Sequence, residues 1–249
     1  MKLIKKVDAL KFRSGKINEI KEDVVSDNPI TLVINGKRVS TFSAIKDSLK
    51  EFSIGYLLGE NIIKSLEEIE DIDIDENIIN IKLINDYKIE DKQLCSDAAG
   101  GLREKVKSAD NIESNLKISS EELVKNMELL TSKAKIWKLT GGTHVAALVY
   151  NNKIILREDV SRHVAVDKVI GAGALEEVDF NQSYIIYSGR MPADMVIKLN
   201  RVGIPIIASN AAPAYSGYLV VKESNMTMIG FLRGENFNVY GNYERIAFN

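Results

Sequence analysis

The chain has 249 residues, of which 45% are hydrophobic and 27% are charged, and its formal net charge is -2 at pH 7. This composition is typical of a globular protein of one or two domains that buries a core, and it excludes a disordered chain. The small net charge gives no general attraction to nucleic acid or to an anionic membrane, so we expect local groups to hold any anionic ligand.

The N-terminal residues lack the apolar stretch of a signal peptide, and no run approaches the roughly 18 apolar residues of a membrane span. We therefore expect a cytoplasmic protein with no membrane partner. The single cysteine, Cys95, excludes an internal disulfide, and two histidines are too few for a zinc cluster of cysteine and histidine ligands. No metal site is predicted.

The first strong pattern along the chain is a β-hairpin. Ile30–Ile34 alternates between apolar and polar residues, Asn35-Gly36 is a turn dipeptide that tolerates positive φ, and Lys37–Phe42 returns as the second strand. Apolar residues then recur at helical spacing up to Gly59. This spacing predicts a helix that buries Ile45, Leu49, Phe52 and Tyr56.

Residues 92–101 are small and polar without apolar periodicity, which predicts a mobile loop around Cys95. Free cysteines are among the most buried residue types and are then inert. The neighbouring serine, aspartate and glycine residues favour an exposed position instead, where a thiolate can react. From the residues alone, both interpretations of Cys95 stay open.

The polar segment 103–117 predicts a domain boundary, with one domain over residues 1–118 and a second over residues 119–249. Ser119 and Glu122 have the spacing of a capping box at the start of a helix. This helix is expected to bury one stripe of side chains, formed by Leu123, Met127, Leu130, Ala134 and Trp137.

Residues 140–171 contain both histidines and two polar turns. A predicted hairpin over residues 145–156 turns at Asn151-Asn152. Thr140-Gly141-Gly142-Thr143-His144 precedes this hairpin, and the charged segment 157–163 follows it. Because the two polar segments meet at the same end of the hairpin, we predict a site there.

This site would contain His144 and His163. The alternative is that each histidine is a satisfied structural residue. Ser161 is a candidate N-cap for the helix that follows the charged segment, and Gly171 is expected to end that helix.

After residue 171, strands and helices alternate, which predicts a parallel sheet covered by helices. In such sheets, ligands bind outside the carboxyl ends of the strands. Three of these ends suit a phosphate or pyrophosphate through backbone N–H groups and guanidinium groups, although each could simply serve a turn or a surface pair. They are Ser188-Gly189-Arg190, Ser209-Asn210-Ala211 and Phe231-Leu232-Arg233-Gly234.

Several motifs together resemble the FdhD family, the formate dehydrogenase accessory sulfurtransferases. They are Thr140-Gly141-Gly142-Thr143-His144, Glu158-Asp159-Val160-Ser161-Arg162-His163, Ser188-Gly189-Arg190, Gly203-Ile204-Pro205 and the stretch from Gly230 to Arg233. Residues 29–36 and 55–63 are similar to the family's N-terminal region, so the resemblance covers nearly the whole chain.

The resemblance implies a sulfur carrier that takes sulfur from a cysteine desulfurase and passes it to the molybdenum or tungsten bis(pterin guanine dinucleotide) cofactor of formate dehydrogenase. It also implies an α/β fold, with a three-layer α-β-α C-terminal domain resembling the cytidine deaminase fold and a smaller α+β N-terminal domain. Deaminase chemistry is not implied, because the chain lacks the zinc ligands. Whether the protein forms a homodimer is left open.

In the family pattern the loop carries a Cys-x-x-Cys pair whose first member is the persulfide carrier. Cys95 occupies the first position and Ala98 the second, so a single thiolate would accept the sulfur. The alternative function is a protein that binds the cofactor or a guanine nucleotide without sulfur transfer. The resemblance assigns cofactor binding to Phe231, Leu232, Arg233, Gly234, Glu235 and Asn236.

The same crevice is expected to bind a GDP-like nucleotide as a mimic of the cofactor. The other residues expected to line it are Ser188, Gly189, Arg190, Ser209, His144 and His163.

Overall fold

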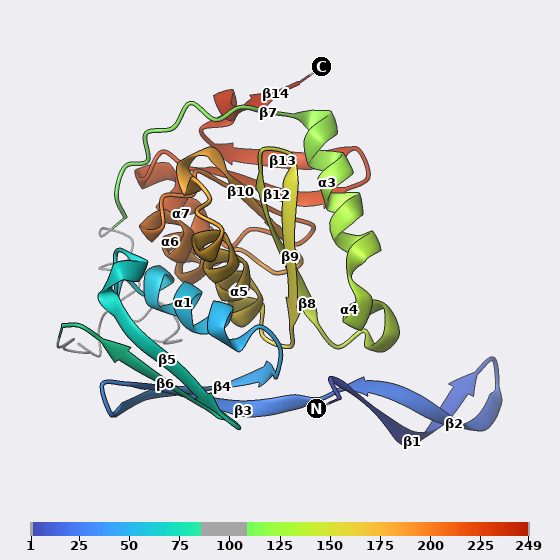
Figure 1. The fold of residues 1–249 in the computed structure, drawn as a ribbon. Coiled ribbons are helices and arrows are strands. Elements are labelled where there is room, and N and C mark those ends of the chain that lie inside the picture. The colour runs from blue at the N-terminus through green and yellow to red at the C-terminus, as the bar shows by residue number, and fades with distance from the viewer. Residues whose placement is uncertain (1, 86–108, 249) are drawn as a thin grey trace.

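The computed structural model describes residues 2–85 and 109–248, which form a mixed α/β fold (Figure 1). A six-stranded sheet lies at the centre, helices cover both of its faces, and a four-stranded sheet and a projecting hairpin lie along one side. The strands are β1 (Ile4–Arg13), β2 (Lys16–Val25), β3 (Asp27–Ile34), β4 (Lys37–Ile45), β5 (Ile69–Asp75), β6 (Ile78–Leu83), β7 (Ile118–Ser119), β8 (His144–Tyr150), β9 (Lys153–Asp159), β10 (Tyr184–Tyr187), β11 (Ile206–Ser209), β12 (Thr227–Arg233), β13 (Asn236–Gly241) and β14 (Ile246–Ala247). The helices are α1 (Leu49–Gly59), α3 (Ser120–Lys133), α4 (Lys135–Thr140), α5 (Arg162–Leu175), α6 (Ala193–Arg201) and α7 (Tyr215–Glu223), with short 3-10 turns η1 (Leu66–Glu68), η2 (Phe180–Gln182) and η3 (Tyr243–Arg245).

The strands β1 and β2 form a hairpin that extends away from the rest of the molecule (Figure 1). They pair antiparallel over their whole length, from Ile4 opposite Val25 to Arg13 opposite Lys16. The sequence analysis predicts no strand here, because neither segment alternates cleanly between apolar and polar residues. We call this hairpin, residues 4–25, the arm.

The hairpin predicted near residue 35 is confirmed. β3 and β4 pair antiparallel, and Asn35 and Gly36 turn the chain with φ angles of 47° and 75°. Ile45 was expected in the following helix but is the last residue of β4. The helix α1 starts only after Ser48, whose φ of 54° lies in the left-handed region and cannot be part of the helix. Ile45 is fully buried in the strand, so the apolar spacing alone could not place it correctly.

The central sheet has the strand order β13-β12-β11-β10-β8-β9 and is mixed, because the three parallel strands predicted after residue 171 are joined by antiparallel neighbours on both sides. β10, β11 and β12 are parallel to one another, whereas β8 runs antiparallel to β9 and β10, and β13 runs antiparallel to β12. The pairs β8–β9 and β12–β13 are joined by two-residue turns, which connect only antiparallel strands. The parallel part is therefore the part whose strands are joined through α6 and α7.

The two faces of the central sheet pack against different helices. Ile185, Ile207 and Met228 belong to the core shared with α5, α6 and α7, whereas their neighbours Ile186 and Ala208 pack on the side of α3. This alternation follows from the two-residue period of a strand. The core under α5 continues through α1 into the four-stranded sheet.

The helices α1 and α5 cross in close contact at two glycines. A Cβ atom on Gly55 would lie 1.8 Å from the carbonyl oxygen of Asp167, and one on Gly171 would lie 1.9 Å from the carbonyl oxygen of Glu51. Gly171 was expected to end its helix, but α5 continues to Leu175. Gly171 lets the two helices approach closely, because a side chain at this position would collide with backbone atoms of α1, which cannot move aside as a flexible side chain can.

The stripe predicted after Ser119 is buried as far as Ala134. Ser119 caps α3 by accepting the N–H of Glu122 at 3.1 Å. At Ala134 the backbone leaves the helical region, with ψ of 92°, and α4 begins as a separate helix. Trp137 was predicted to be buried, but this break leaves it 41% exposed. None of the helices in the described part of the chain is long and apolar enough to cross a membrane.

Candidate functional site

The two polar turns around β8 and β9 meet at one end of the hairpin, as predicted. His144 at the start of β8 lies opposite Asp159 at the end of β9. Because β8 is antiparallel to β10, the start of β8 also lies beside the end of β10, where Ser188 follows. This end of the central sheet, with the loops that follow β10, β11 and β12, is the candidate site.

A pocket of about 410 Å³ opens at this end of the sheet, and we call it the strand-end pocket. The end of α3 and the residue Trp137 line one side, the turn Gly141-Gly142 and His144 line the next, and Ser188 and Asn210 complete it. Trp137 is the only tryptophan of the chain. Its half-exposed ring is a flat apolar surface of the kind on which a heterocyclic base stacks.

The turn Gly141-Gly142 positions Trp137 and His144 on either side of it. Gly141 has a φ of 65° and ends α4, and its N–H donates to the carbonyl oxygen of Trp137 at 2.7 Å. A Cβ atom on Gly142 would lie 2.7 Å from Cγ1 of Val25, at the base of the arm. Glycine at both positions therefore lets the chain turn directly from α4 into β8.

His144 and Ser188 connect β8 to the loop after β10. Ser188 Oγ accepts the N–H of Val145 at 3.0 Å and lies 3.3 Å from Nδ1 of His144. Burial, followed by the positive charge of Arg162, lowers the pKa of His144, although Ser188 and Asp159 act in the opposite direction. His144 is therefore neutral at neutral pH, with one nitrogen donating and the other accepting.

Arg162 and His163, the first residues of α5, lie beside the same loop. A Cβ atom on Gly189 would lie 3.2 Å from Cδ of Arg162, so the glycine leaves room for this side chain. Nε of Arg162 and Nδ1 of His163 are buried and have no hydrogen-bond partner within the described residues. Buried polar atoms without a hydrogen-bond partner cost free energy and are rare, so these two nitrogens mark a place that a ligand can complete.

Asp194 at the start of α6 fixes the other side of the His163 ring. Its Oδ2 lies 3.3 Å from Nε2 of His163. Burial alone would raise the pKa of Asp194, but the hydrogen bond and charge of His163, with smaller contributions from the Met195 N–H and Arg162, outweigh burial and lower it. Asp194 is thus a carboxylate that orients His163. We call His144, Arg162, His163, Ser188 and Asp194 the polar cluster.

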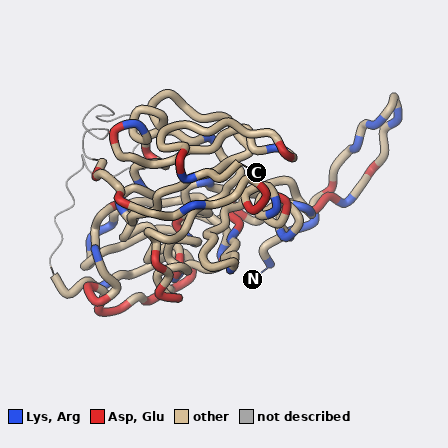
Figure 2. Tube along the Cα trace, turned by 90° about the horizontal axis from the view of Figure 1, so that it is seen from above, with Lys and Arg blue, Asp and Glu red and all other residues tan. Residues whose placement is uncertain are grey.

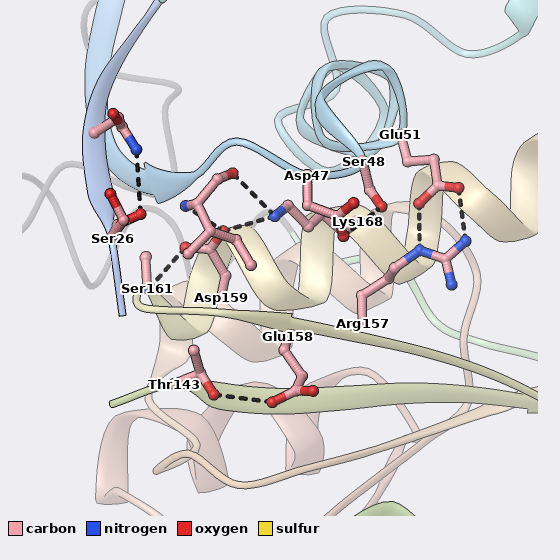
Figure 3. Close-up of polar contacts among 12 residues, drawn as sticks. Ser26, Asp47, Ser48, Glu51, Thr143, Arg157, Glu158, Asp159, Ser161 and Lys168 are labelled. Carbon is pink, nitrogen blue, oxygen red and sulfur yellow. Dashed lines mark hydrogen bonds and ion pairs between the residues drawn. The ribbon is translucent and has the colours of Figure 1, made fainter. Parts of the chain in front are cut away.

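Three neighbouring charged residues already have structural partners (Figure 3). The guanidinium of Arg157 pairs with Glu51 on α1, with Nη2 at 2.6 Å from Oε1. Glu158 accepts the N–H groups at the start of α4 at 3.0 and 2.7 Å. Asp159 accepts a hydrogen bond from Lys168 at 2.7 Å, and neither side chain is exposed. These residues hold the elements around the site together.

The predicted residues at the ends of β10 and β11 have different roles. Ser209 is fully buried, donates to the carbonyl oxygen of Gly189 at 2.6 Å and accepts the N–H of Ala211 at 3.0 Å. Its hydroxyl therefore ties the two strand ends together. Arg190 is exposed, whereas Arg233 donates from Nε to the carbonyl oxygen of Asn210, a pocket residue, at 3.1 Å.

The predicted cofactor-binding segment 231–236 covers the end of β12, the turn Gly234-Glu235 and the first residue of β13. Phe231 and Gly234 have positive φ angles of 58° and 54°, and the N–H of Phe231 donates to the loop after β11. Leu232 is 1% exposed and packs in the core under α3. Glu235 lines a separate pocket against α3, and Asn236 pairs with the residue before the turn. The six residues therefore face several directions, with Phe231 and Arg233 beside the strand-end pocket.

Cys95, the predicted persulfide carrier, and Ala98 lie outside the described residues. Within residues 2–85 and 109–248, no group of three or more histidine, cysteine, aspartate or glutamate side chains could hold a metal ion. Sequence reasoning missed Trp137, Arg162 and Asp194 as site residues. Arg162 was visible within the quoted motif, but nothing in the sequence pairs Asp194 with His163.

Comparison with known proteins gives a consistent result over the whole chain. The sequence model of the FdhD/NarQ family matches residues 25–247. A protein named sulfur carrier protein FdhD from Methanothermobacter thermautotrophicus is 44% identical over 248 residues, which cover 99% of this chain and 100% of that protein. The protein of the same name from Bacillus subtilis is 30% identical over 96% of each chain.

Among solved structures, a formate dehydrogenase accessory protein from Desulfotalea psychrophila has the same fold. The TM-score is 0.84 at 28% sequence identity, and the match covers 99% of this chain and 100% of that one. Sequence and fold thus agree along the full length. The chain belongs to the FdhD/NarQ family.

Proposed function

We propose that this chain is a sulfur carrier that acts in the cytoplasm and serves formate dehydrogenase. The observation that carries this proposal is the full-length similarity to proteins named sulfur carrier protein FdhD, at 44% identity over 99% of the chain for one of them. The fold shared with a formate dehydrogenase accessory protein supports the same partner. The sulfur donor would be a cysteine desulfurase.

Cys95 is the only thiol of the chain, so it is the residue that can hold the sulfur. Its thiolate attacks the outer sulfur of a persulfide on the desulfurase. A new S–S bond forms at Cys95, the donor's S–S bond breaks, and the donor cysteine leaves as a thiolate. Because Ala98 occupies the position of the second loop cysteine, no neighbouring thiol can release the sulfur by forming a disulfide within the loop.

The substrate that receives the sulfur would be the molybdenum or tungsten bis(pterin guanine dinucleotide) cofactor. Two features support binding of the guanine nucleotide part of this cofactor in the strand-end pocket. Trp137 offers an exposed ring to the base, and Arg162 beside the pocket has a buried donor nitrogen without a partner in the described chain. A guanidinium that pairs with phosphate suits the diphosphate of the nucleotide, for which GDP is the simplest probe.

The sulfur-carrier proposal is tested by measuring the intact mass of the protein after incubation with a cysteine desulfurase and cysteine. We expect a gain of one sulfur atom, which a thiol reductant removes. Cys95→Ser is the control, and its fold and GDP binding are checked in parallel. Because the chain has one cysteine, a sulfur gain that persists in Cys95→Ser would contradict the proposal, and so would no gain in the wild type.

A cofactor-binding protein without sulfur transfer is the second candidate function. The observation that favours it is Ala98, which leaves the loop with one thiol. The two candidates differ in what Cys95→Ala does in cells that lack the native protein. If the protein is a sulfur carrier, the Cys95→Ala variant does not restore formate dehydrogenase activity to these cells. If it is a binding protein without sulfur transfer, the variant restores the activity in full.

We also infer that the part of the chain after residue 118 has the architecture of the cytidine deaminase fold and is a second domain, which packs against residues 1–118 through the core that α1 and α5 share. The mixed sheet with helices on both faces supports the first inference. Limited proteolysis within residues 103–117 that yields two stable fragments would support the second.

A further inference from the structure

The outer edge of β13 differs from the other sheet edges of the described chain. β13 is the last strand on one side of the central sheet and pairs with β12 alone among the described strands (Figure 1). Its outer edge therefore has a row of backbone N–H and C=O groups that no described strand pairs with. Such an edge is a template for a strand of another chain, and proteins normally protect it with charged side chains or proline.

The edge of β13 has no such protection. Its six residues, Asn236–Gly241, include no lysine, arginine, aspartate, glutamate or proline. The other edge strands longer than two residues in the described sheets, β1, β2, β4, β5 and β9, all contain charged residues. Figure 2 shows this for the arm, where charged residues recur along both strands. Because the central sheet protects its β9 edge and not its β13 edge, we expect the β13 edge to pair with another protein.

A groove of about 550 Å³ opens where β13 ends, and we call it the tyrosine groove. Its walls come from α7 and from the segment that follows β13. Tyr218 and Tyr243 line it, and Tyr243 is 67% exposed. Tyr240 of β13 contacts Tyr218 edge to face, with the ring centroids 6.5 Å apart. Tyrosines are enriched at protein interfaces, because their rings bury a large apolar area while their hydroxyl groups still form hydrogen bonds.

The other end of β13 lies at the predicted cofactor-binding segment. This segment, residues 231–236, ends at the first residue of β13. A strand that pairs with the whole of β13 is about 20 Å long and runs from this segment to the tyrosine groove. The groove contains Lys222 and Glu244, one charge of each sign, and so fits an uncharged segment. A protein that receives the cofactor has to approach residues 231–236, and its contact surface then continues along the β13 edge.

We propose that the β13 edge and the tyrosine groove form the docking site for cofactor-free formate dehydrogenase. An extended, uncharged segment of that enzyme pairs with β13 as an added strand and places an apolar side chain in the groove. In this mode of recognition, backbone hydrogen bonds provide the affinity and the side-chain pocket provides the specificity. The choice of partner rests on the proposed function, whereas the edge and the groove are properties of this chain alone.

Biolayer interferometry of the full chain against the formate dehydrogenase of the same organism, produced without its cofactor, tests the docking site. Asn238→Lys places a charge at an exposed position of β13 and should raise the Kd by roughly tenfold or more, because charged residues on an edge oppose strand pairing. Asn80→Lys is the matched control. Asn80 is an exposed asparagine of β6, an inner strand, so this substitution should leave the Kd unchanged.

Tyr243→Ala removes one wall of the tyrosine groove and should also raise the Kd by roughly tenfold. Tyr215→Ala is its control, because Tyr215 is 76% exposed on α7 and stacks on Tyr218 but does not line the groove. All these variants should still load sulfur on Cys95, which separates failure of the docking site from failure of the proposed function. A wild type that loads sulfur but does not bind the enzyme would overturn the docking site, and so would unchanged binding in Asn238→Lys and Tyr243→Ala.

Hydrogen–deuterium exchange of the same complex identifies the strand that makes the contact. Adding the enzyme should slow the exchange of the outward-facing amides of β13 and leave the edges β5 and β9 unchanged. Protection of β5 or β9 without protection of β13 would contradict the proposal. Protection of β13 that appears in the chain alone as its concentration rises would show that a second copy occupies this edge, and it would overturn the proposal as well.

Discussion

The charged segment between β9 and α5 contains two groups of residues that differ in their partners. Arg157, Glu158 and Asp159 all have structural partners from other parts of the chain. A few residues later, Arg162 and His163 have buried nitrogen atoms that no described residue satisfies. In the sequence, both groups form one polar run. The comparison shows that charge density identifies a region, whereas the buried nitrogens without a partner among the described residues mark where we propose that a ligand binds.

The largest expected effect is a loss of stability when one of the structural ion pairs is broken. Lys168→Met leaves the fully buried carboxylate of Asp159 without its cation, and removing one partner of a buried pair typically costs about 3 to 5 kcal/mol. Urea denaturation should show a loss of unfolding free energy of this size. Lys82→Met is the control, because its ion pair with Glu70 is exposed and is worth at most about 1 kcal/mol. Equal losses in both variants would contradict the structural role of Lys168.

Arg162→Ala should instead weaken GDP binding and leave the stability of the protein nearly unchanged. Losing one charge-assisted hydrogen bond costs about 1.5 to 3 kcal/mol of binding free energy, or roughly ten- to a hundredfold in the Kd for GDP. Its stability should change little, because the buried nitrogen has no partner to lose within the described chain. Calorimetric titration with GDP gives the Kd, and thermal denaturation gives the stability.

Arg190 and Arg233 sharpen this test. Both are exposed, so their contribution to GDP binding should be smaller than that of Arg162 and should fall as salt is added. An affinity loss in Arg190→Ala or Arg233→Ala that exceeds the loss in Arg162→Ala would move the phosphate site to the outer rim.

Trp137→Ala removes the apolar side of the strand-end pocket. Stacking of a base on an aromatic ring is worth about 1 to 3 kcal/mol, so the Kd for GDP should rise by up to a hundredfold. Leu139→Ala is the control, because Leu139 is 58% exposed on the same helix and does not line the pocket. Similar losses in both variants would indicate a general effect of α4 rather than stacking.

The smallest effect concerns the pH dependence of stability. The pKa of His144 is lowered in the folded chain, first by burial and then by Arg162. Protonation therefore favours the unfolded chain, so stability is intact above the unfolded value of about 6.5 and falls as the pH drops below it. Between about pH 8 and pH 5.5 the Tm of the wild type should fall more than that of His144→Gln. A larger fall in the variant would contradict this sign.

Local signals in the sequence predicted the hairpin at Asn35-Gly36, the helix cap at Ser119 and the convergence of both turns around β8 and β9. These features depend on the backbone preferences of a few adjacent residues, so they can be predicted from the local sequence alone. The exposed side of Trp137 depends on a break at Ala134, and apolar spacing continues across that break unchanged. Gly171 was misplaced for a similar reason, because its role is a contact with a helix more than a hundred residues away.

The site was predicted as a region more accurately than as a set of residues. Ser188, His144 and His163 do lie together, since strand ends and glycine turns determine their positions. Ser209 and Leu232 were assigned to the ligand but are buried in structural contacts. A hydroxyl or an apolar side chain at a strand end has the same sequence in either role, and only its partners distinguish the two.

The most direct test of the strand-end pocket uses the fluorescence of Trp137, the only tryptophan of the chain. Titration with GDP should change the emission in a saturable way, because the ring lines the pocket. The fitted Kd should rise at least tenfold in Arg162→Ala and stay unchanged in folded Lys168→Met. If calorimetry showed GDP binding while the emission of Trp137 did not change, the nucleotide would bind elsewhere and the assignment of this pocket would be wrong.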